Sequence, residues 1–367
     1  MNNKDCKENK KIVFIAMALS QPRCIKRVIS FKERGFECQV FGYDRGKYDI
    51  NSYPEDVSVT NLGRLEDNKY FWKSIKVFRD IVRIKKANHS KGTIFYAFGF
   101  FQALYLKLLG ERYIYEISDI LYAYPKFRLF VKPLKALDKR VINGSLATVM
   151  TSGGFYSWFG VESPKVFVIP NKVSPLLQRP SLNLSFEKTG KLTFGFVGSL
   201  RYKSITLFAE VVGESFPEYE FHFWGGTTEK SLAKCKQLTD SFNNIHYHGP
   251  FRSPQDLPKI YGSFDITIAC YQVASLNEKI AEPNKLYESL FFCKPIVVSD
   301  GLYLSDRVRE LDCGFCVNPD SKETIHDFIS SLTIERVKQI AIIESNLDLK
   351  EIINNQSALN DFIWEKI

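Results

Sequence analysis

Four polar side chains with complementary chemistry, Glu282, Asn284, Lys285 and Glu288, lie within seven positions of the sequence. Pro283 favours a helix that begins here, because the amide that proline lacks would have no intrahelical partner. Residues three and four apart share a helix face, so Glu288 is predicted beside Asn284 and Lys285. First-turn amides favour a phosphate, and a carboxylate one turn along can accept hydrogen bonds from both ribose hydroxyls. The alternative is a solvated helix start that leads into a core strand.

A glycine followed by two basic residues forms a second candidate group. Gly198 follows a predicted strand at 192–197, and Arg201 and Lys203 come just before a helix predicted to begin near Ser204. Glycine admits a phosphate close to the backbone, and the two cations would neutralise its charge. The pattern predicts a loop that binds a diphosphate.

Acidic residues also mark the end of a predicted strand at 113–117. Glu116 lies within this strand, and Asp119 lies just beyond it. Doubly wound parallel sheets bind their ligands at the carboxyl ends of the strands. Both carboxylates are therefore candidate ligand contacts, while capping of the next helix is the competing role for Asp119. Arg23 lies in the loop after the first predicted strand, where a surface arginine is the default expectation.

The elements that would position these residues alternate between strands and helices. A strand at 11–17, a helix that ends at Gly35 and a strand at 37–42 open a doubly wound parallel sheet. The first loop has no Gly-x-Gly-x-x-Gly pattern, which argues against a nicotinamide or flavin dinucleotide there. A length of 367 residues suggests two domains. The predicted parts are an N-terminal domain at 1–173, a linker at 174–190, a C-terminal domain at 191–345 and a helical tail at 346–367.

The stretch from Glu282 to Glu288, followed by Lys294-Pro295-Ile296-Val297-Val298, resembles the donor-nucleotide motif of GT-B glycosyltransferases, family 4 (group 1) in particular. The resemblance implies an α/β protein of two Rossmann-like parallel-sheet domains that face a cleft, with a C-terminal helix that crosses back to the first domain. Two positions depart from the family pattern. Ile280 stands where the first glutamate commonly lies, and Cys293 stands where glycine is usual.

The same resemblance implies roles for the residues of the predicted helix. Glu288 would hold the ribose of the nucleotide, and Asn284 and Lys285 would contact the diphosphate or the sugar. Glu282 would contact the donor sugar, with Glu278 as the alternative.

For the other candidates, the resemblance implies that Arg201 and Lys203, beside Gly198, bind the donor diphosphate. Asp119 would lie near the reacting sugar, with Glu116 as the reserve, and Arg23 would be a candidate acceptor or donor contact.

A net charge of +9 and a pI near 8.9 predict an anionic partner. Two regions, 72–91 and 122–140, combine basic and aromatic residues with an amphipathic pattern, which suits an anionic membrane surface. Core-packed helices with solvated basic faces are the alternative. No base-reading or RNA-binding motif accompanies the charge, so no nucleic acid is expected. A polar N-terminal segment and scattered cysteines predict a cytoplasmic protein, peripherally associated with the inner face of the cytoplasmic membrane.

Metal and cofactor signals are weak in this sequence. It contains no Asp-x-Asp, which argues against a divalent metal in the reaction, and no cofactor is expected besides the nucleotide-sugar substrate. His246 and His248 alternate on a predicted strand, and without a third ligand nearby we interpret them as structural. Cys313 and Cys316 are interpreted as packed thiols.

The predicted function is transfer of a sugar from a nucleotide-diphosphate sugar to a membrane-associated, lipid-linked saccharide acceptor. The resemblance implies a metal-independent hexosyltransferase that retains anomeric configuration, in bacterial capsule, O-antigen or exopolysaccharide assembly. Two alternatives stay open: a sugar-nucleotide epimerase of the same fold, and a non-catalytic protein that binds nucleotide sugars.

Overall fold

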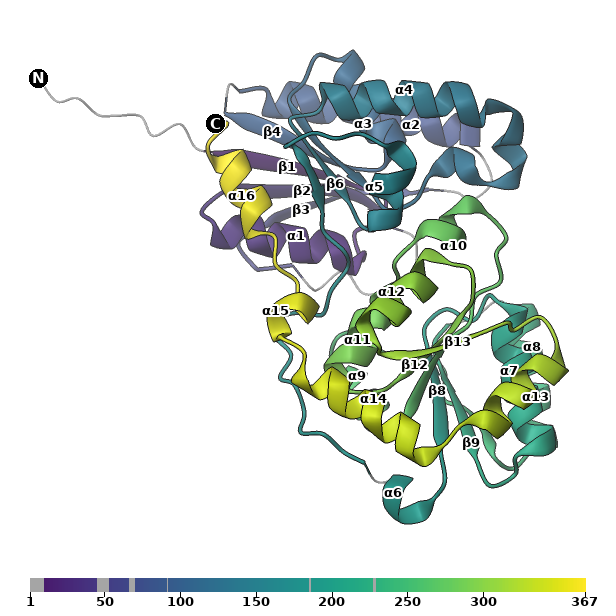
Figure 1. The fold of residues 1–367 in the computed structure, drawn as a ribbon. Helices are drawn as coiled ribbons and strands as arrows, with labels where there is room; N and C mark the ends of the chain where they lie inside the picture. Colours follow the sequence, from purple (N-terminus) through teal and green to yellow (C-terminus); the bar gives the residue numbers. More distant parts are fainter. Residues whose placement is uncertain (1–9, 45–52, 66–69, 91, 185, 227–228) are drawn as a thin grey trace, which may run out of the picture. The chain divides into compact units, whose positions relative to one another are not determined.

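The computed structural model describes residues 10–44, 53–65, 70–90, 92–184, 186–226 and 229–367. These residues form two compact units (Figure 1). The first contains the chain up to Ile169 together with Asn355–Ile367, and the second contains Pro170–Asn354.

The first unit contains a seven-stranded parallel sheet with the strand order β3-β2-β1-β4-β5-β6-β7. Its strands are β1 Lys11–Ala16, β2 Glu37–Asp44, β3 Ser58–Arg64, β4 Thr93–Phe98, β5 Tyr113–Ile117, β6 Ala147–Met150 and β7 Val166–Val168. Its α-helices are α1 Pro22–Glu33, α2 Tyr70–Asn88, α3 Phe100–Leu108, α4 Val131–Gly144, α5 Gly153–Phe159 and α16 Ser357–Trp364. Every residue of β4 is buried, as expected for a central strand that is covered on both faces.

The C-terminal helix α16 packs on the first unit beside α1 (Figure 1). Leu359 and Ile363 are fully buried in the core of this unit. The Asn360 amide donates to the Ser30 carbonyl at 3.0 Å, which ties α16 to the end of α1. The predicted return of the C-terminal helix is therefore present.

The basic region 122–140 does not form one helix. It contains two short 3-10 helices, η1 Leu121–Ala123 and η2 Pro125–Phe130, before α4 begins at Val131. Pro125 explains the interruption, because proline lacks an amide donor and forces the preceding residue out of helical geometry. Tyr124 is indeed extended, with φ −71° and ψ 147°.

The second unit contains a six-stranded parallel sheet with the order β10-β9-β8-β11-β12-β13. Its strands are β8 Thr193–Val197, β9 Glu220–Trp224, β10 Ile245–Tyr247, β11 Ile266–Ala269, β12 Ile296–Ser299 and β13 Gly314–Val317. Its helices are α6 Phe186–Thr189, α7 Lys203–Ser215, α8 Glu229–Ser241, α9 Leu257–Tyr261, α10 Leu276–Ile280, α11 Asn284–Phe292, α12 Tyr303–Leu311, α13 Lys322–Ser331, α14 Ile334–Asn346 and α15 Leu349–Ile352.

Alternating side chains of the second sheet fill two cores. Phe194, Phe221 and Phe223 belong to the core that includes α7 and α13, whereas Val197 and Trp224 belong to the core that includes α9 and α11. The strand order reverses between β8 and β11, so the carboxyl ends of these two strands mark the topological switch point. The predicted fold of two doubly wound parallel sheets is thus confirmed.

The segment predicted as a linker, 174–190, lies within the second unit. The Arg179 guanidinium anchors it, donating to the carbonyls of Leu290 at 2.9 Å and Phe291 at 3.1 Å at the end of α11. It also reaches the carbonyl of Leu347 at 3.3 Å. The chain passes between the units at Ile169–Pro170 and Asn354–Asn355.

Candidate functional site

The loop after β8 is built on close backbone packing between two glycines. Gly198 has φ +141° and Gly225, just after β9, has φ +135°. A Cβ atom at Gly225 would lie 1.9 Å from the Gly198 carbonyl oxygen, and a Cβ at Gly198 would lie 2.6 Å from the Lys285 Nζ. Both positions therefore require glycine. The result is half-buried glycine backbone at the strand end, next to the ammonium of Lys285.

Helix α11 begins at Asn284, as the sequence predicts, with Pro283 at its cap position and no side chain bonded to its first amides. Glu288, one turn along, is buried at 7% exposure. Its carboxylate accepts a hydrogen bond from the Asn284 amide at 2.6 Å and another from the Tyr261 hydroxyl at 2.8 Å. These two donors fix the carboxylate and leave lone pairs on each oxygen for further donors.

Lys285 is a buried cation without a close counter-charge. Its Nζ lies 5.0 Å from the centre of the Phe196 ring and 5.6 Å from that of Tyr271. Among the described residues, no carboxylate lies within ion-pair distance of it. Burial lowers the Lys285 pKa to about 8; Glu288 opposes this shift, and the positive charge of Arg201 adds to it.

The two basic residues of the loop are exposed. The Arg201 Nε donates to the Ser199 hydroxyl at 3.1 Å, and Lys203 is the first residue of α7. The structure thus brings Gly198, Arg201 and Lys285 together around the carboxyl end of β8. It places Lys203 at the adjoining helix start.

Glu282 has partners of its own inside the second unit. It is buried, accepts a hydrogen bond from the Tyr287 hydroxyl at 2.6 Å and lies 3.5 Å from the Arg307 Nε of α12. The alternative sugar contact, Glu278, lies in the short helix α10 and accepts a hydrogen bond from the Ser275 hydroxyl. The charge of Glu282 is therefore already compensated within the protein.

In the first unit, Asp119 is exposed just past the carboxyl end of β5. The following helix, η1, has Ile120 at its cap position, so Asp119 is not its capping residue. This placement matches the strand-end position from which the candidate role was inferred.

Glu116, the reserve candidate, lies in a buried polar network. Its carboxylate lies 2.5 Å from the Arg23 Nε and 2.9 Å from the Arg27 Nε, and it accepts a hydrogen bond from the Tyr96 hydroxyl. Arg23 also donates to the Ser118 hydroxyl at 2.7 Å. Glu116 therefore holds two arginines in place, and Arg23 connects this network to the residue before Asp119.

Several side chains of the site have no signal in the sequence. Tyr261 and Tyr271 come from α9 and from the end of β11, and Arg307 comes from α12. None of the three belongs to a recognisable sequence motif, so only the fold could reveal its contact. Together with the residues predicted for the second unit, they form a surface of amide donors, cations and one fixed carboxylate. Such a surface can bind a diphosphate and a vicinal diol.

The two doubly wound sheets define a GT-B fold, and solved structures share it. The chain is similar to Alr3699/HepE of Anabaena, solved with UDP and glucose, with 14% identity, coverage of 97% of this chain and 99% of that chain, and a TM-score of 0.69. It is similar to sucrose-phosphate synthase from Thermosynechococcus elongatus, with 10% identity, 97% of each chain covered and a TM-score of 0.72. A third similar structure is WaaG, a glycosyltransferase involved in lipopolysaccharide biosynthesis, with 15% identity, 96% and 99% coverage and a TM-score of 0.65.

The family comparison concerns the second unit. Residues 191–334 match the family described as Glycosyl transferases group 1. The comparison with curated proteins found no matching sequence. The resemblance to GT-B group 1 glycosyltransferases, drawn from the motif around Glu288, is thereby confirmed.

Within the part of the chain that the structure describes, every helix is too short or too polar to span a bilayer.

Proposed function

We propose that this glycosyltransferase is a hexosyltransferase that moves a sugar from a nucleoside-diphosphate sugar to a lipid-linked saccharide acceptor. The observation that carries the proposal is the buried Lys285 ammonium near Arg201. Burial, with a smaller effect from the charge of Arg201, lowers the Lys285 pKa to about 8. A diphosphate beside both cations would supply the missing negative charge and relieve their repulsion. Solved structures of HepE with UDP and with UDP-glucose, which share the fold, support this ligand class.

In the reaction, the bond between the anomeric carbon and a diphosphate oxygen breaks, and the acceptor oxygen forms the new bond to that carbon. Negative charge grows on the departing diphosphate, where Lys285, Arg201 and the first amides of α11 stabilise it. Lys203 adds charge at the start of α7. Glu288 binds the ribose hydroxyls, and Asp119 acts at the reacting centre. The family resemblance supports retention of configuration and a reaction without a metal.

Binding of the donor is tested by calorimetry with UDP, GDP and ADP and their hexose derivatives. One nucleotide series should bind to the parent protein. Glu288→Gln keeps the shape of the side chain but removes its charge, so we expect about tenfold weaker binding, typical of a lost charged hydrogen bond. Glu335→Gln changes an exposed glutamate on α14 and serves as the matched control. Equal affinities for Glu288→Gln and the control would contradict the assigned ribose contact.

Transfer itself separates the proposal from its two alternatives. The proposal predicts that radiolabelled donor sugar moves into the lipid fraction of a bacterial membrane extract, and that Asp119→Asn abolishes transfer while the donor still binds. Epimerisation of donor alone, without transfer to lipid, would favour the epimerase. A non-catalytic protein would show neither transfer nor epimerisation. Lys203→Ala would then leave its biological effect unchanged.

The structure offers a candidate membrane face on the first unit. Leu129 and Phe130 of η2 are exposed by 89% and 58%, and Leu108 at the end of α3 is exposed by 69%. Helix α3 packs against both α2 and α4, so these elements lie side by side (Figure 1). Exposed Lys132 and Arg140 lie on α4, which begins directly after the apolar pair. Apolar side chains among cations suit an anionic membrane surface.

Not all basic residues of these helices are available to lipids. The Lys76 ammonium donates to Asp80 at 3.0 Å, and Lys135 donates to the Trp158 carbonyl at 2.6 Å. The exposed Arg79 and Lys86 on α2 are better candidates for a lipid contact.

Flotation with phosphatidylglycerol vesicles tests this face. Neutralising Lys132 and Arg140 to glutamine should weaken binding about thirtyfold, at about 1 kcal/mol per cation near the surface. Leu129→Ser with Phe130→Ser should also release the protein, whereas Lys188→Gln with Lys191→Gln in the second unit should not. The membrane hypothesis fails if phosphatidylglycerol vesicles retain no protein at low salt. The proposed cytoplasmic location at the inner face of a bacterial membrane then fails with it.

A further inference from the structure

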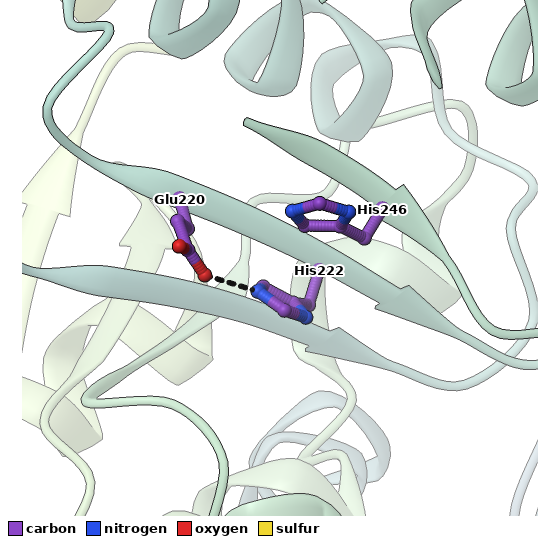
Figure 2. Close-up of side chains that lie close together, drawn as sticks. All are labelled: Glu220, His222 and His246. Carbon is purple, nitrogen blue, oxygen red and sulfur yellow. Dashed lines mark hydrogen bonds and ion pairs between the residues drawn. The ribbon is translucent and has the colours of Figure 1, made fainter. Parts of the chain in front are cut away.

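A cluster of histidines lies at the edge of the second sheet and includes none of the residues assigned to the donor. Glu220 and His222 are on β9, and His246 is on the edge strand β10 (Figure 2). The two strands pair in parallel, with His246 directly opposite His222. Alternate residues of a strand point to the same face, so Glu220 shares the face of His222.

This pairing corrects the interpretation of the strand histidines as lacking a third ligand. The sequence shows His246 and His248 two residues apart, but their additional partners lie more than twenty residues earlier, on β9. Only the register of β9 against β10 brings Glu220 and His222 to His246.

The ligand atoms of Glu220, His222 and His246 all lie within 4.8 Å of one another. The His222 Nε2 lies 2.9 Å from a Glu220 carboxylate oxygen, and the His222 and His246 ring centres are 4.7 Å apart. Two ligands of a tetrahedral zinc ion are separated by about 3.3 Å, given bonds of about 2.0 to 2.1 Å. The Glu220 side chain is 54% exposed, so it can reorient towards a cation without displacing core side chains.

His248 supports the group from outside. Its Nε2 is hydrogen-bonded to the His222 Nδ1 at 2.9 Å, and its ring stacks on Trp224 with the ring centres 4.5 Å apart. A histidine that binds a metal through one nitrogen usually engages a hydrogen-bond partner through the other. His222 already has this arrangement, with its Nε2 directed at Glu220 and its Nδ1 held by His248.

We propose that Glu220, His222 and His246 bind a zinc-class divalent cation, with His248 as the residue that orients His222. Two imidazoles and one carboxylate match the ligands that zinc and neighbouring transition metals prefer, whereas calcium and magnesium require mostly oxygen ligands. Three protein ligands leave a position for water.

The proposed cation is structural and separate from the transfer chemistry. It would link the edge strand β10 to its neighbour β9 through side chains on one face of the sheet. Strand β9 leads into Gly225, whose backbone packs on Gly198. The Gly225 amide donates to the carbonyl of Gly249, which follows β10, at 2.7 Å. Metal binding would therefore stabilise the strand pair that supports the glycine loop. The inference does not depend on the proposed donor or acceptor.

Zinc titration of the full-length, tag-free protein after dialysis against EDTA tests the proposal. We expect one site in the parent by calorimetry, and a visible absorption band typical of low-coordinate Co²⁺ when cobalt replaces zinc. His246→Ala and Glu220→Gln should abolish this site, and His248→Phe, which keeps a ring beside Trp224, should weaken it by about tenfold to hundredfold. His326→Ala, on exposed α13, is the matched control and should bind like the parent.

Two readouts separate loss of ligands from loss of folding. Metal-free His246→Ala and parent should melt at similar temperatures, because His246 lies on an edge strand and is only partly buried. Saturating zinc should then raise the Tm of the parent and of His326→Ala but not of His246→Ala. The proposal is overturned if the parent binds no zinc, or if His246→Ala and Glu220→Gln bind it as the parent does; the histidines then serve only as an aromatic stack on Trp224.

Discussion

The unusual protonation of Lys285 predicts how nucleotide binding depends on pH. Burial, with the added effect of Arg201, lowers its pKa to about 8 in the unliganded protein. An anionic diphosphate stabilises the charged form, so binding should raise this pKa towards the ordinary lysine value near 10.5. The bound state then holds a proton that the free state loses above about pH 8, and affinity must fall as pH rises.

The size of the effect follows from the two pKa values. With a free value of about 8 and a bound value near 10.5, affinity at pH 9 should be about tenfold lower than at pH 7, where both states are protonated. The phosphates of a nucleoside diphosphate are already ionised in this range, since their last pKa is about 6. Calorimetry with the nucleotide that binds best, in buffers matched for ionic strength, measures the slope.

Two substitutions make the test specific to Lys285. Lys285→Met removes the titrating group, so its affinity should be low and nearly constant over the same range. Arg201→Gln removes a like charge and should move the midpoint to higher pH. A parent protein whose affinity is equal at both pH values, or a Lys285→Met variant that keeps the parent's slope, would refute the reasoning.

The stability of the unliganded protein should show the opposite trend in the same range. Between about pH 8 and 10.5 the unfolded chain holds a proton on Lys285 that the folded protein has released. The Lys285 contribution to the free energy of unfolding therefore rises with pH, and Lys285→Met should flatten this component in melts without ligand.

Two further predictions concern the core of each unit. Gly225→Ala places a Cβ against the Gly198 carbonyl at a positive φ. It should destabilise the protein by about 2 kcal/mol or more and weaken nucleotide binding. Gly226→Ala has open space around the added atom and should change neither the Tm nor the nucleotide affinity, measured by thermal melts and calorimetric titrations. Burial raises the pKa of Asp138 to about 7, an effect that hydrogen bonds from Tyr122 and Tyr115 oppose only in part. The folded protein thus holds a proton that the unfolded chain loses above about pH 4, so the free energy of unfolding falls as pH rises to about 7. Asp138→Asn should raise the Tm at pH 8 by about 5 °C and change it little at pH 4. An equal change in Tm at both pH values would contradict this reasoning.

The parts of the site that depend on local rules were predictable from the sequence. Pro283 sets the start of α11, and the spacing of Asn284 and Glu288 along one helix produces their hydrogen bond. Gly198 was identifiable because it ends an apolar strand. These features need only neighbours within one turn of helix or one strand end.

Features that depend on contacts between distant segments were not predictable in the same way. Tyr261 reaches Glu288 from another helix, and nothing in its own segment signals that contact. The burial of Glu116 depends on Arg27 and Tyr96, which lie on α1 and β4 of the first unit. The histidine cluster depends on the register of two strands, which a motif search along one strand cannot detect.

Glu282 and Lys285 differ in what a ligand can add to them. Glu282 has a hydroxyl donor in Tyr287 and a guanidinium in Arg307, so a sugar hydroxyl would compete with partners that already compensate its charge. Lys285 presents the reverse situation, because its charge is buried against Phe196 and Tyr271 without a carboxylate at ion-pair distance among the described residues. An anion that reaches this ammonium forms an interaction that the free protein lacks, and it gains from the low polarity around it. The free energy of donor binding should therefore come mainly from the diphosphate at Lys285 and Arg201, with the sugar contributing selectivity more than affinity.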